Sequence, residues 1–468
     1  MIVIHVRRGE CVMRKSRLLN MTSGNPTRLL AMFALPMLVG NLFQQAYNLV
    51  DSIVVGQFVG ASALAAVGAT GSVTFLFFSI SGGIGAGCSI ITSQYFGAND
   101  TVRTKQSMVN AAYVMLVTAL IMGSIAYIAA PGVLRLMGTP EEILPDAVLY
   151  MRINCIGVPL VAVYNYTSSM LRALGDSRTP LYFLIFASVV NIVLDLVFVC
   201  VFAMGVMGVA WATIIAQFIS GIGCLLYVMK YNPYFLISRN ECKPNVAMIR
   251  RAVQLGIPLA MQWSMIALSS AALQTFVNSF GTAAMAAYAA TARVEQLVHQ
   301  PYGSLSTALS TYASQNYGAK KMDRVKSGLG HSMVMSAVFT AVVMIALQLF
   351  ADQIIAVFVD DAEVIRIGAH GLRITSYFYI FLALINMSRG VLNGVGDALF
   401  ALINGGVEVA GRIFVPMLLV LIPGLGMWSI WWTSGVVWVL SGSSCLFRYL
   451  FWQRKIRSVE DVSTGQAA

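Results

Sequence analysis

The sequence has few charged residues for its length: of 468 positions, 10% are Asp, Glu, Lys or Arg, and 58% are hydrophobic. A soluble protein carries about a quarter of its residues charged, because it must cover its surface. The composition therefore excludes a large soluble domain. The apolar runs reach the roughly 20 residues that cross a bilayer as a helix, whereas a transmembrane β-barrel shows short alternating segments. We expect an all-α polytopic membrane protein.

Cysteine is also sparse, and its positions form no framework. The residues are Cys11, Cys88, Cys155, Cys200, Cys224, Cys242 and Cys445. Their scattered spacing fits neither metal ligation nor a set of disulfides, so we interpret them as small apolar fillers.

Catalytic motifs are absent from the sequence as well. There is no phosphate-binding P-loop, no HExxH, no CxxC, no G-x-S-x-G and no dinucleotide fingerprint. This predicts a protein that is not an enzyme, with no catalytic residues, no ATP drive of its own and no cofactor beyond a coupling ion.

The net charge of +11 suggests nucleic-acid binding at first, but the positions of the charges do not. Basic residues gather in both tails and in alternate connections, among which we count those near Arg172, Arg178 and Arg389. The opposite connections are short or acidic, as at Glu141 and Glu142. This is the positive-inside pattern of a membrane protein. We expect both termini in the cytoplasm and no nucleic-acid partner.

Twelve apolar spans are predicted. They cover roughly 29–55, 62–95, 107–130, 147–171, 180–202 and 208–229, then 250–277, 283–315, 329–350, 365–389, 399–421 and 427–450. The domains that follow are a cytoplasmic tail (1–28), a first six-helix bundle (29–229), a cytoplasmic linker (230–249), a second bundle (250–450) and a cytoplasmic tail (451–468).

An internal repeat at an offset of about 221 residues relates the two halves. SQYFGANDTVRTK (Ser93–Lys105) recurs as SQNYGAKKMDRVK (Ser314–Lys326), and Gly175-Asp176 recurs as Gly396-Asp397. Landmarks that match at one offset are a strong repeat signal. Because each half has an even number of spans, the repeats are parallel and related by an axis along the membrane normal, an architecture typical of transporters.

A polar stripe runs along the first span. Asn41, Gln44, Asn48 and Asp51 recur at helical spacing, with Tyr47 beside them. Polar groups in hydrocarbon cost free energy unless they are partnered. An ionisable residue inside a span is a functional-site hypothesis, so we expect this face to line a cavity or a binding site.

A second carboxylate, Asp195, lies in the middle of the fifth span, with Asn191 one turn before it on the same face. A buried carboxylate with a second one nearby is suited to bind and release a proton, or to hold Na⁺ together with uncharged oxygens. Asn165 and Thr213 are candidates for those oxygens. Each of these polar residues also has a plain alternative, an interhelical hydrogen bond.

The repeat makes these carboxylates specific to the first bundle. Asp51 falls opposite Ala272 or Leu273, and Asp195 falls opposite Pro416. A structural polar pair would be expected in both copies, whereas an ion-coupling site is needed only once.

Other charged residues within spans have several interpretations. Glu408 and Arg412, at i and i+4, are predicted to form a buried pair, with a substrate or gating role as the alternative. Arg293 and Glu295 are candidates to shape a cavity in the second bundle.

Several segments resemble the multidrug and toxin extrusion (MATE) family. They are LPMLVGNLFQQAYNLVDSIVVGQFVGASALAAVG at 35–68, the two SQ-x-x-G-A repeats, LRALGDSRTP at 171–180 and NIVLDLVF at 191–198. The likeness extends from about residue 26 to 450 and is strongest to the DinF-like and MepA-like bacterial branch. It implies a V-shaped pair of six-helix bundles in the bacterial cytoplasmic membrane. It also implies export of small amphipathic, usually cationic drugs in exchange for H⁺ or Na⁺.

The resemblance assigns roles to particular residues. The first-helix aspartate of the family is Asp51, the fifth-helix pair is Asp195 with Asn191, the fourth-helix asparagine is Asn165, and the sixth-helix hydroxyl is Thr213. If the coupling ion is Na⁺, these five residues are its expected ligands. One departure is the lack of a carboxylate on the first and fourth spans of the second bundle, where some relatives bind a cation.

Two prolines are candidate bending points for alternating access, Pro36 and its counterpart Pro258, because proline removes a helical hydrogen bond. We expect a monomer surrounded by lipid. Two other functions remain open: a flippase for a lipid-linked or other amphipathic metabolite, which would need basic residues in a central cavity, and a membrane enzyme, which would need a catalytic cluster.

Overall fold

The computed structural model describes residues 18–463, without the side chains of 72, 73, 76–78 and 455–463. The predicted tails therefore lie in part outside the described residues. The first half forms α1 (Pro26–Val54), α2 (Ala61–Gly97), α3 (Thr101–Leu136), α4 (Leu144–Ala173), α5 (Arg178–Leu196) and α6 (Gly205–Tyr231). The second half forms α7 (Val246–Asn278), α8 (Thr282–Gly318), α9 (Met322–Ala356), α10 (Ala362–Ser376), α11 (Tyr379–Val395), α12 (Ala398–Leu419) and α13 (Ser429–Ser463).

These helices coincide with the predicted spans. Among the described residues, nine helices are long and apolar enough to cross a membrane, and α10 with α11, bent by 52°, form a tenth span. The two remaining long helices, α2 and α8, have the same length and occupy equivalent places in the repeat. Helices α1 and α7 continue through Pro36 and Pro258 without ending.

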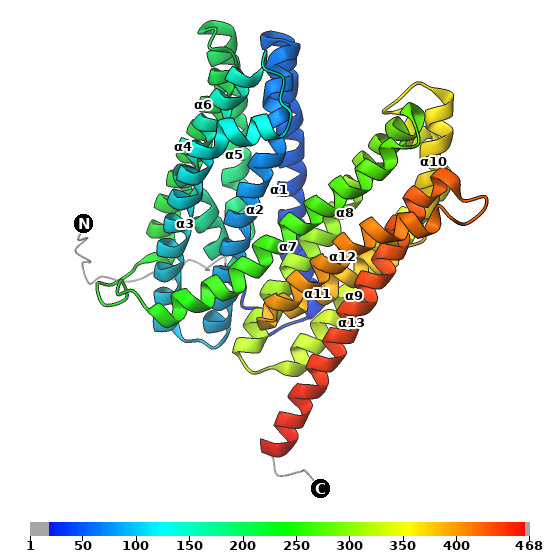
Figure 1. Cartoon of the computed structure of the whole chain (residues 1–468). Helices are drawn as coiled ribbons and strands as arrows, with labels where there is room; N and C mark the ends of the chain where they lie inside the picture. Colours follow the sequence, from blue (N-terminus) through cyan, green and yellow to red (C-terminus); the bar gives the residue numbers. More distant parts are fainter. Residues whose placement is uncertain (1–17, 464–468) are drawn as a thin grey trace.

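The helices form two groups that meet at one end and diverge toward the other (Figure 1). The segment between α6 and α7, which contains a short 3₁₀ helix (Pro233–Phe235), lies at the end where the groups meet, and so does the end of α13. We call this the linker end. The bundles contact each other mainly through α2, which packs against α7 and α8, and through α1, which packs against α8.

The α2 and α7 helices cross with almost no side chain between them. A Cβ added to Gly83 would lie 2.3 Å from the backbone nitrogen of Ala260, and one added to Gly87 would lie 2.6 Å from that of Gly256. Glycine here permits close contact of two backbones, the usual role of small residues between membrane helices. These glycines therefore serve close packing of the two helices.

The repeated SQ-x-x-G-A motifs meet each other at the linker end. Ser93 Oγ and Gln315 Nε2 both donate to the carbonyl of Ala173, each at 3.1 Å. In the equivalent arrangement, Ser314 Oγ (2.9 Å) and Gln94 Nε2 (3.1 Å) donate to the carbonyl of Gly394. Each glutamine therefore crosses to the other bundle. We call these four donors and two carbonyls the seam.

The backbone follows the same repeat. Gly60 and Gly281, which begin α2 and α8, have φ of 116° and 87°. Asn99 and Lys320, which follow these helices, have φ of 57° and 59°. All four angles lie in the left-handed region that most side chains avoid, so the two halves share their turns as well as their helices.

Replacing Gly97 by valine is expected to separate the bundles at the linker end. A Cβ at Gly97 would lie 1.9 Å from the backbone oxygen of Gln315, and a backbone atom in a packed helix has little room to move. Overpacking of this kind costs about 1–3 kcal/mol, so the contact should form about ten-fold less often or worse. The rate of thiol cross-linking between Ala98→Cys and Ala319→Cys, which line one pocket, measures the contact.

The matched control for this variant is Gly303→Ala. Gly303 lies in α8, and an added Cβ would meet nothing within 4 Å. With the same two cysteines, it should cross-link as fast as the chain that keeps Gly97 and Gly303. Equal rates in the Gly97→Val variant would show that this approach of the backbones does not hold the bundles together.

Candidate functional site

Two carboxyl groups from different helices face each other inside the first bundle. Asp51 lies on α1 and Asp195 on α5, and these helices pack against each other. Asp195 is only 1% exposed, whereas Asp51 is half-buried. The two carboxyl groups lie within hydrogen-bonding range of each other.

Asn191 connects this pair to a third helix. With its amide nitrogen turned toward the carboxyl groups, it donates to Asp195 Oδ2 at 3.1 Å and to Asp51 Oδ1 at 3.2 Å. Its oxygen then accepts from the backbone nitrogen of Thr213, on α6, at 3.2 Å. The Tyr47 side chain, one turn before Asp51, lies beside the same cluster.

No basic side chain neutralises this cluster. None of the ion pairs found among the described residues includes Asp51 or Asp195. Within the same part of the chain, Asp195 Oδ1 is buried and has no hydrogen-bond partner. Two carboxylates this close repel each other unless a proton or a cation lies between them. The arrangement is therefore chemically suited to bind one or the other.

The helices that carry the carboxyl groups both change their winding just beyond them. Helix α1 continues as a π-helix over Val55–Val59, and α5 continues as a π-helix over Val197–Val201. The two segments touch, within an apolar cluster that includes Val54, Val199 and Val209. Single π turns are rare and occur often at functional sites. Here they end the polar region with a layer of valine.

Asn165 does not join the carboxyl cluster. It lines an adjoining cavity between α2, α4 and α6, and Thr213 belongs to the same wall. The lining residues are Thr74, Ser81, Met151, Asn154, Cys155, Val158, Val161, Asn165, Thr213, Ile214 and Gln217. With about 50 Å³ of water-accessible space, the cavity has room for a few water molecules and not for a drug-sized compound.

Of the five predicted coupling residues, the structure thus brings together Asp51, Asn191, Asp195 and Thr213 and leaves Asn165 one cavity away. Four polar residues of the cavity were missed by sequence reasoning: Thr74, Ser81, Asn154 and Gln217. Gln217 lies four residues after Thr213, and Asn154 lies eleven before Asn165, spacings that keep each pair on one helix face. This periodicity was the available signal.

The rest of the polar stripe on α1 serves other contacts. Asn41 Nδ2 donates to Ser304 Oγ on α8 at 3.2 Å, which ties α1 to the second bundle. Gln44 and Asn48 are exposed. The stripe therefore does not act as one unit: its first residue bridges the bundles and its last belongs to the carboxyl cluster.

The predicted ion pair between Glu408 and Arg412 is wrong. Glu408 Oε1 accepts from Arg389 Nη2 on α11 at 2.7 Å. Arg412 instead donates from Nη1 to Ser270 Oγ on α7 at 2.8 Å. Arg389 is only 9% exposed within its helix, so its assignment to a cytoplasmic connection is also wrong. The two errors have one cause, because the basic partner of Glu408 was counted among the loop charges.

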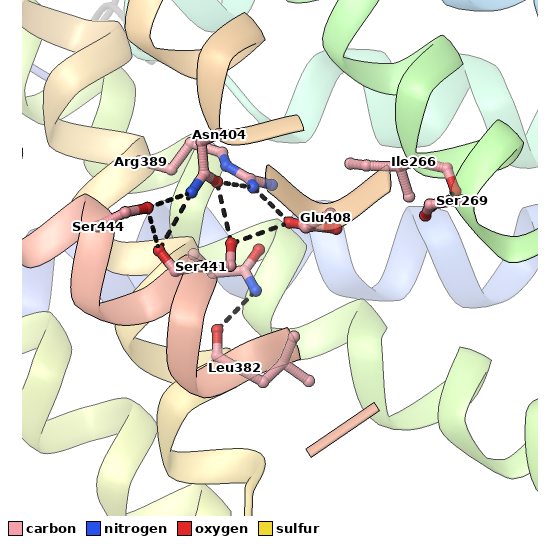
Figure 2. A network of polar contacts seen from close by, with 9 residues as sticks. Ile266, Ser269, Leu382, Arg389, Asn404, Glu408, Ser441 and Ser444 are labelled. Carbon is pink, nitrogen blue, oxygen red and sulfur yellow. Dashed lines mark hydrogen bonds and ion pairs between the residues drawn. The ribbon is translucent and has the colours of Figure 1, made fainter. Parts of the chain in front are cut away.

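The Arg389–Glu408 pair belongs to a buried polar network in the second bundle (Figure 2). Asn404 Oδ1 accepts from Arg389, and Asn404 Nδ2 donates to Ser444 Oγ at 2.8 Å. Ser441 Oγ lies 3.2 Å from both Asn404 Oδ1 and Glu408 Oε1. With its amide oxygen turned toward Arg389, Gln262 on α7 accepts from Nη1 and Nε, each at 2.8 Å. The network joins α7, α11, α12 and α13.

Arg293 and Glu295 on α8 have different surroundings. Arg293 is exposed, whereas Glu295 is half-buried and lies close enough to Arg412 to sense its charge. Their role in a second-bundle cavity remains a prediction.

The architecture defines a class before any relative is considered: two parallel helical repeats of membrane-spanning length, with an unneutralised carboxyl pair in one of them, make a multi-pass membrane transporter. The model of the MatE family matches residues 36–197 and 258–415, one stretch in each bundle. The chain belongs to the MatE family, the MATE transporters that its motifs resemble, and its members are transporters, not enzymes.

Relatives and solved structures agree with this membership. The chain is 31% identical over 385 residues to the probable multidrug resistance protein YpnP of Bacillus subtilis (strain 168), covering 82% of this chain and 85% of that protein. It is 22% identical over 421 residues to the multidrug export protein MepA of Staphylococcus haemolyticus (strain JCSC1435), covering 90% of this chain and 91% of that protein.

Among solved structures, a MATE protein crystallised in the bent conformation superposes with a TM-score of 0.85 at 21% identity, over 95% of this chain and 98% of that chain. An outward-facing multidrug resistance MATE family transporter of the MOP superfamily superposes with a TM-score of 0.83 at 21% identity, over 94% of this chain and 98% of that chain. The expected fold class is confirmed.

Proposed function

We propose that this chain exports small amphipathic compounds, mainly cationic ones, in exchange for H⁺ or Na⁺ bound by the first bundle. The observation that carries this proposal is the convergence of Asp51 and Asp195 on the Asn191 amide, at 3.2 and 3.1 Å. The buried, unpartnered Asp195 Oδ1 adds to it. Such an atom is costly in a membrane protein unless it binds something.

Coupling requires that the ion favour one conformation over the other. Asp51 and Asp195 lie on different helices, α1 and α5. With the ion bound, the two carboxyl groups attract a shared charge and hold these helices together. Without it, they repel each other, so α1 moves away from α5 more easily. Because α1 also contacts α8 through Asn41 and Ser304, such a movement reaches the second bundle directly.

A proton and Na⁺ remain alternatives as the coupling ion. Among the described residues, no three His, Cys, Asp or Glu side chains are grouped to hold a metal ion. A Na⁺ ion would therefore take its other ligands from neutral oxygens. The nearest are the Thr213 hydroxyl and the Asn191 amide oxygen, which would have to turn toward the carboxyl groups. Asn165 would contribute through water from the adjoining cavity. Oxygen ligands of this kind suit hard cations.

Drug export is supported by the names of the relatives, since YpnP is called a probable multidrug resistance protein and MepA a multidrug export protein. The site of the drug is a separate matter from the ion site, because the cavity beside Thr213 holds only water-sized groups. We place the protein in the bacterial cytoplasmic membrane as a monomer in lipid, with the linker end and both termini in the cytoplasm.

Flux measurements with purified protein in liposomes test the proposal. A cationic dye should accumulate when a pH gradient or a Na⁺ gradient is imposed alone, and not when neither is present. For each proton exchanged, a gradient of one pH unit supports about a ten-fold dye gradient. Liposomes without protein and liposomes with the gradient collapsed by an ionophore are the controls. Equal dye movement with and without every gradient would contradict coupled export.

A further inference from the structure

Arg412 is a guanidinium group within a membrane-spanning helix that lacks an acidic partner. Its one hydrogen bond is from Nη1 to the neutral Ser270 Oγ, at 2.8 Å. Its Nε is buried and has no partner, and none of the ion pairs found among the described residues includes it. A charged side chain at such a depth usually pairs or marks a ligand pathway.

The carboxylates near Arg412 form no ion pair with it. Glu408, one turn earlier, is held by Arg389 at 2.7 Å and by Ser441. Glu295, on α8, is close enough to sense the charge of Arg412, but none of the ion pairs among the described residues joins the two. The other titratable groups that sense Arg412 are Tyr288 and His299 on α8, and neither brings a fixed negative charge. The charge of Arg412 is thus without a negative group in contact.

The surroundings of Arg412 are polar and accessible. Arg412 is half-buried, and its partner Ser270 is exposed on α7. The same stretch of α7 presents the exposed Thr275 and the half-buried Ser264 and Gln274. The polar side chains of α7 are each bonded within their own helix, so Arg412 is the charged group of this region that still needs a partner.

The free edge of the guanidinium matches a particular chemistry. Ser270 uses Nη1 and Nε is buried, which leaves Nη2 to bind a carboxylate oxygen through a charge-assisted hydrogen bond. The repeat gives this position further meaning. At the offset of 221, Arg412 occupies the place of Asn191, Pro416 that of Asp195 and Ala272 that of Asp51. Where the first bundle collects negative charge, the second presents an arginine.

We propose that Arg412, oriented by Ser270, is a subsite for a carboxylate group of the exported compound. The substrates of this chain then include amphipathic zwitterions and acids, with an anionic group that docks on the second bundle. This inference rests on the proposed function as an exporter and specifies one class of its substrates.

Equilibrium binding of two dyes to the purified protein tests the subsite. The dyes are a cationic rhodamine methyl ester and its free acid, which differ by one methyl group and one negative charge. Removing a charge-assisted partner weakens binding by about ten-fold. By fluorescence polarisation, Arg412→Gln should weaken binding of the acid by that factor and change binding of the ester less than about two-fold. Arg412→Lys, which keeps the charge but not the planar guanidinium that Ser270 orients, should lie between.

Arg366→Gln is the matched control, because Arg366 is exposed on α10, and it should bind both dyes normally. Ser270→Ala, a milder change, should weaken binding of the acid about three-fold and spare the ester; it decides the matter if Arg412→Gln fails to fold. Equal loss for both dyes, no loss for either, or no binding of the acid to the unmodified protein would overturn the proposal.

The binding assay needs no gradient, so its result is separate from that of the flux assay. Discrimination between the dyes without gradient-driven flux would refute coupled export and support the subsite. Gradient-driven flux of the ester, with no effect of Arg412→Gln on binding of the acid, would support coupled export and refute the subsite.

Discussion

Asp195→Asn is expected to lose gradient-driven export almost completely, with an initial rate about 100-fold below that of the unmodified protein. Asparagine has nearly the same shape as aspartate, so the contact with Asn191 can persist while the ionisable group is gone. The pair with Asp51 would then no longer require a proton or cation. Without that requirement, ion binding cannot favour one conformation, and coupling ends.

The measurement is dye export from liposomes under an imposed gradient, for Asp195→Asn and for Asp51→Asn. Glu142→Gln, an exposed carboxylate in the turn before α4, is the control and should export normally. If both aspartate variants exported as fast as the unmodified protein, the assignment of the ion site to the first bundle would be wrong.

Arg389→Met is expected to lower the free energy of unfolding by about 3–5 kcal/mol, the typical cost of leaving a buried charge without its partner. Glu408 is only 6% exposed, so water cannot replace the arginine. Gln262 and Asn404 lose a donor in the same change. Unfolding in detergent, followed by circular dichroism, measures the loss.

The double variant Arg389→Met/Glu408→Leu separates this explanation from a general packing defect. Apolar side chains that replace both partners of a buried ion pair often leave stability unchanged or higher. The double variant should therefore recover most of the loss. If it were as unstable as Arg389→Met alone, shape rather than charge would account for the effect.

The fold was largely predictable from the sequence because its determinants are local and redundant. An apolar run of membrane-spanning length can form little other than a helix in a bilayer, since every backbone group must be hydrogen-bonded. The first and last predicted spans, 29–55 and 427–450, lie within α1 with its π-helical continuation and within the last helical stretch, Gly426–Arg454. The motif around Gln94 and Gln315 was also found as a repeat, although its contact across the bundles was not foreseen.

The partners within the second bundle were harder to predict. Residues at i and i+4 lie about 40° apart around a helix, enough for Glu408 to face α11 and α13 while Arg412 faces α7. Helical spacing shows that two residues are neighbours, but not which neighbouring helix each one faces. The contact between Arg389 and Gln262 joins residues more than a hundred positions apart, and no periodicity records such a contact.

In the candidate ion site, too, the contact within one helix was predictable from the sequence and the contacts between helices were not. Asn191 and Asp195 were placed together correctly because one turn of α5 separates them. Bringing Asp51 to them depends on the packing of α1 against α5. Asn165 was a candidate for a neutral oxygen of this site, and the family resemblance assigned it there as well. In this structure it belongs to the adjoining cavity. Its distance from the carboxyl groups depends on how α4 lies against α6.

The seam at the linker end can also be viewed as an interface between two subunits that share one chain. Gln94 gives the second half what Gln315 gives the first, and Ser93 and Ser314 bind the same two carbonyls from within their own halves. This is the reciprocity of an isologous homodimer. Such an interface contains two equivalent contacts, so one hydrogen bond across the seam can break while the other remains formed. The chain is, at this point, a covalent dimer of its own repeat.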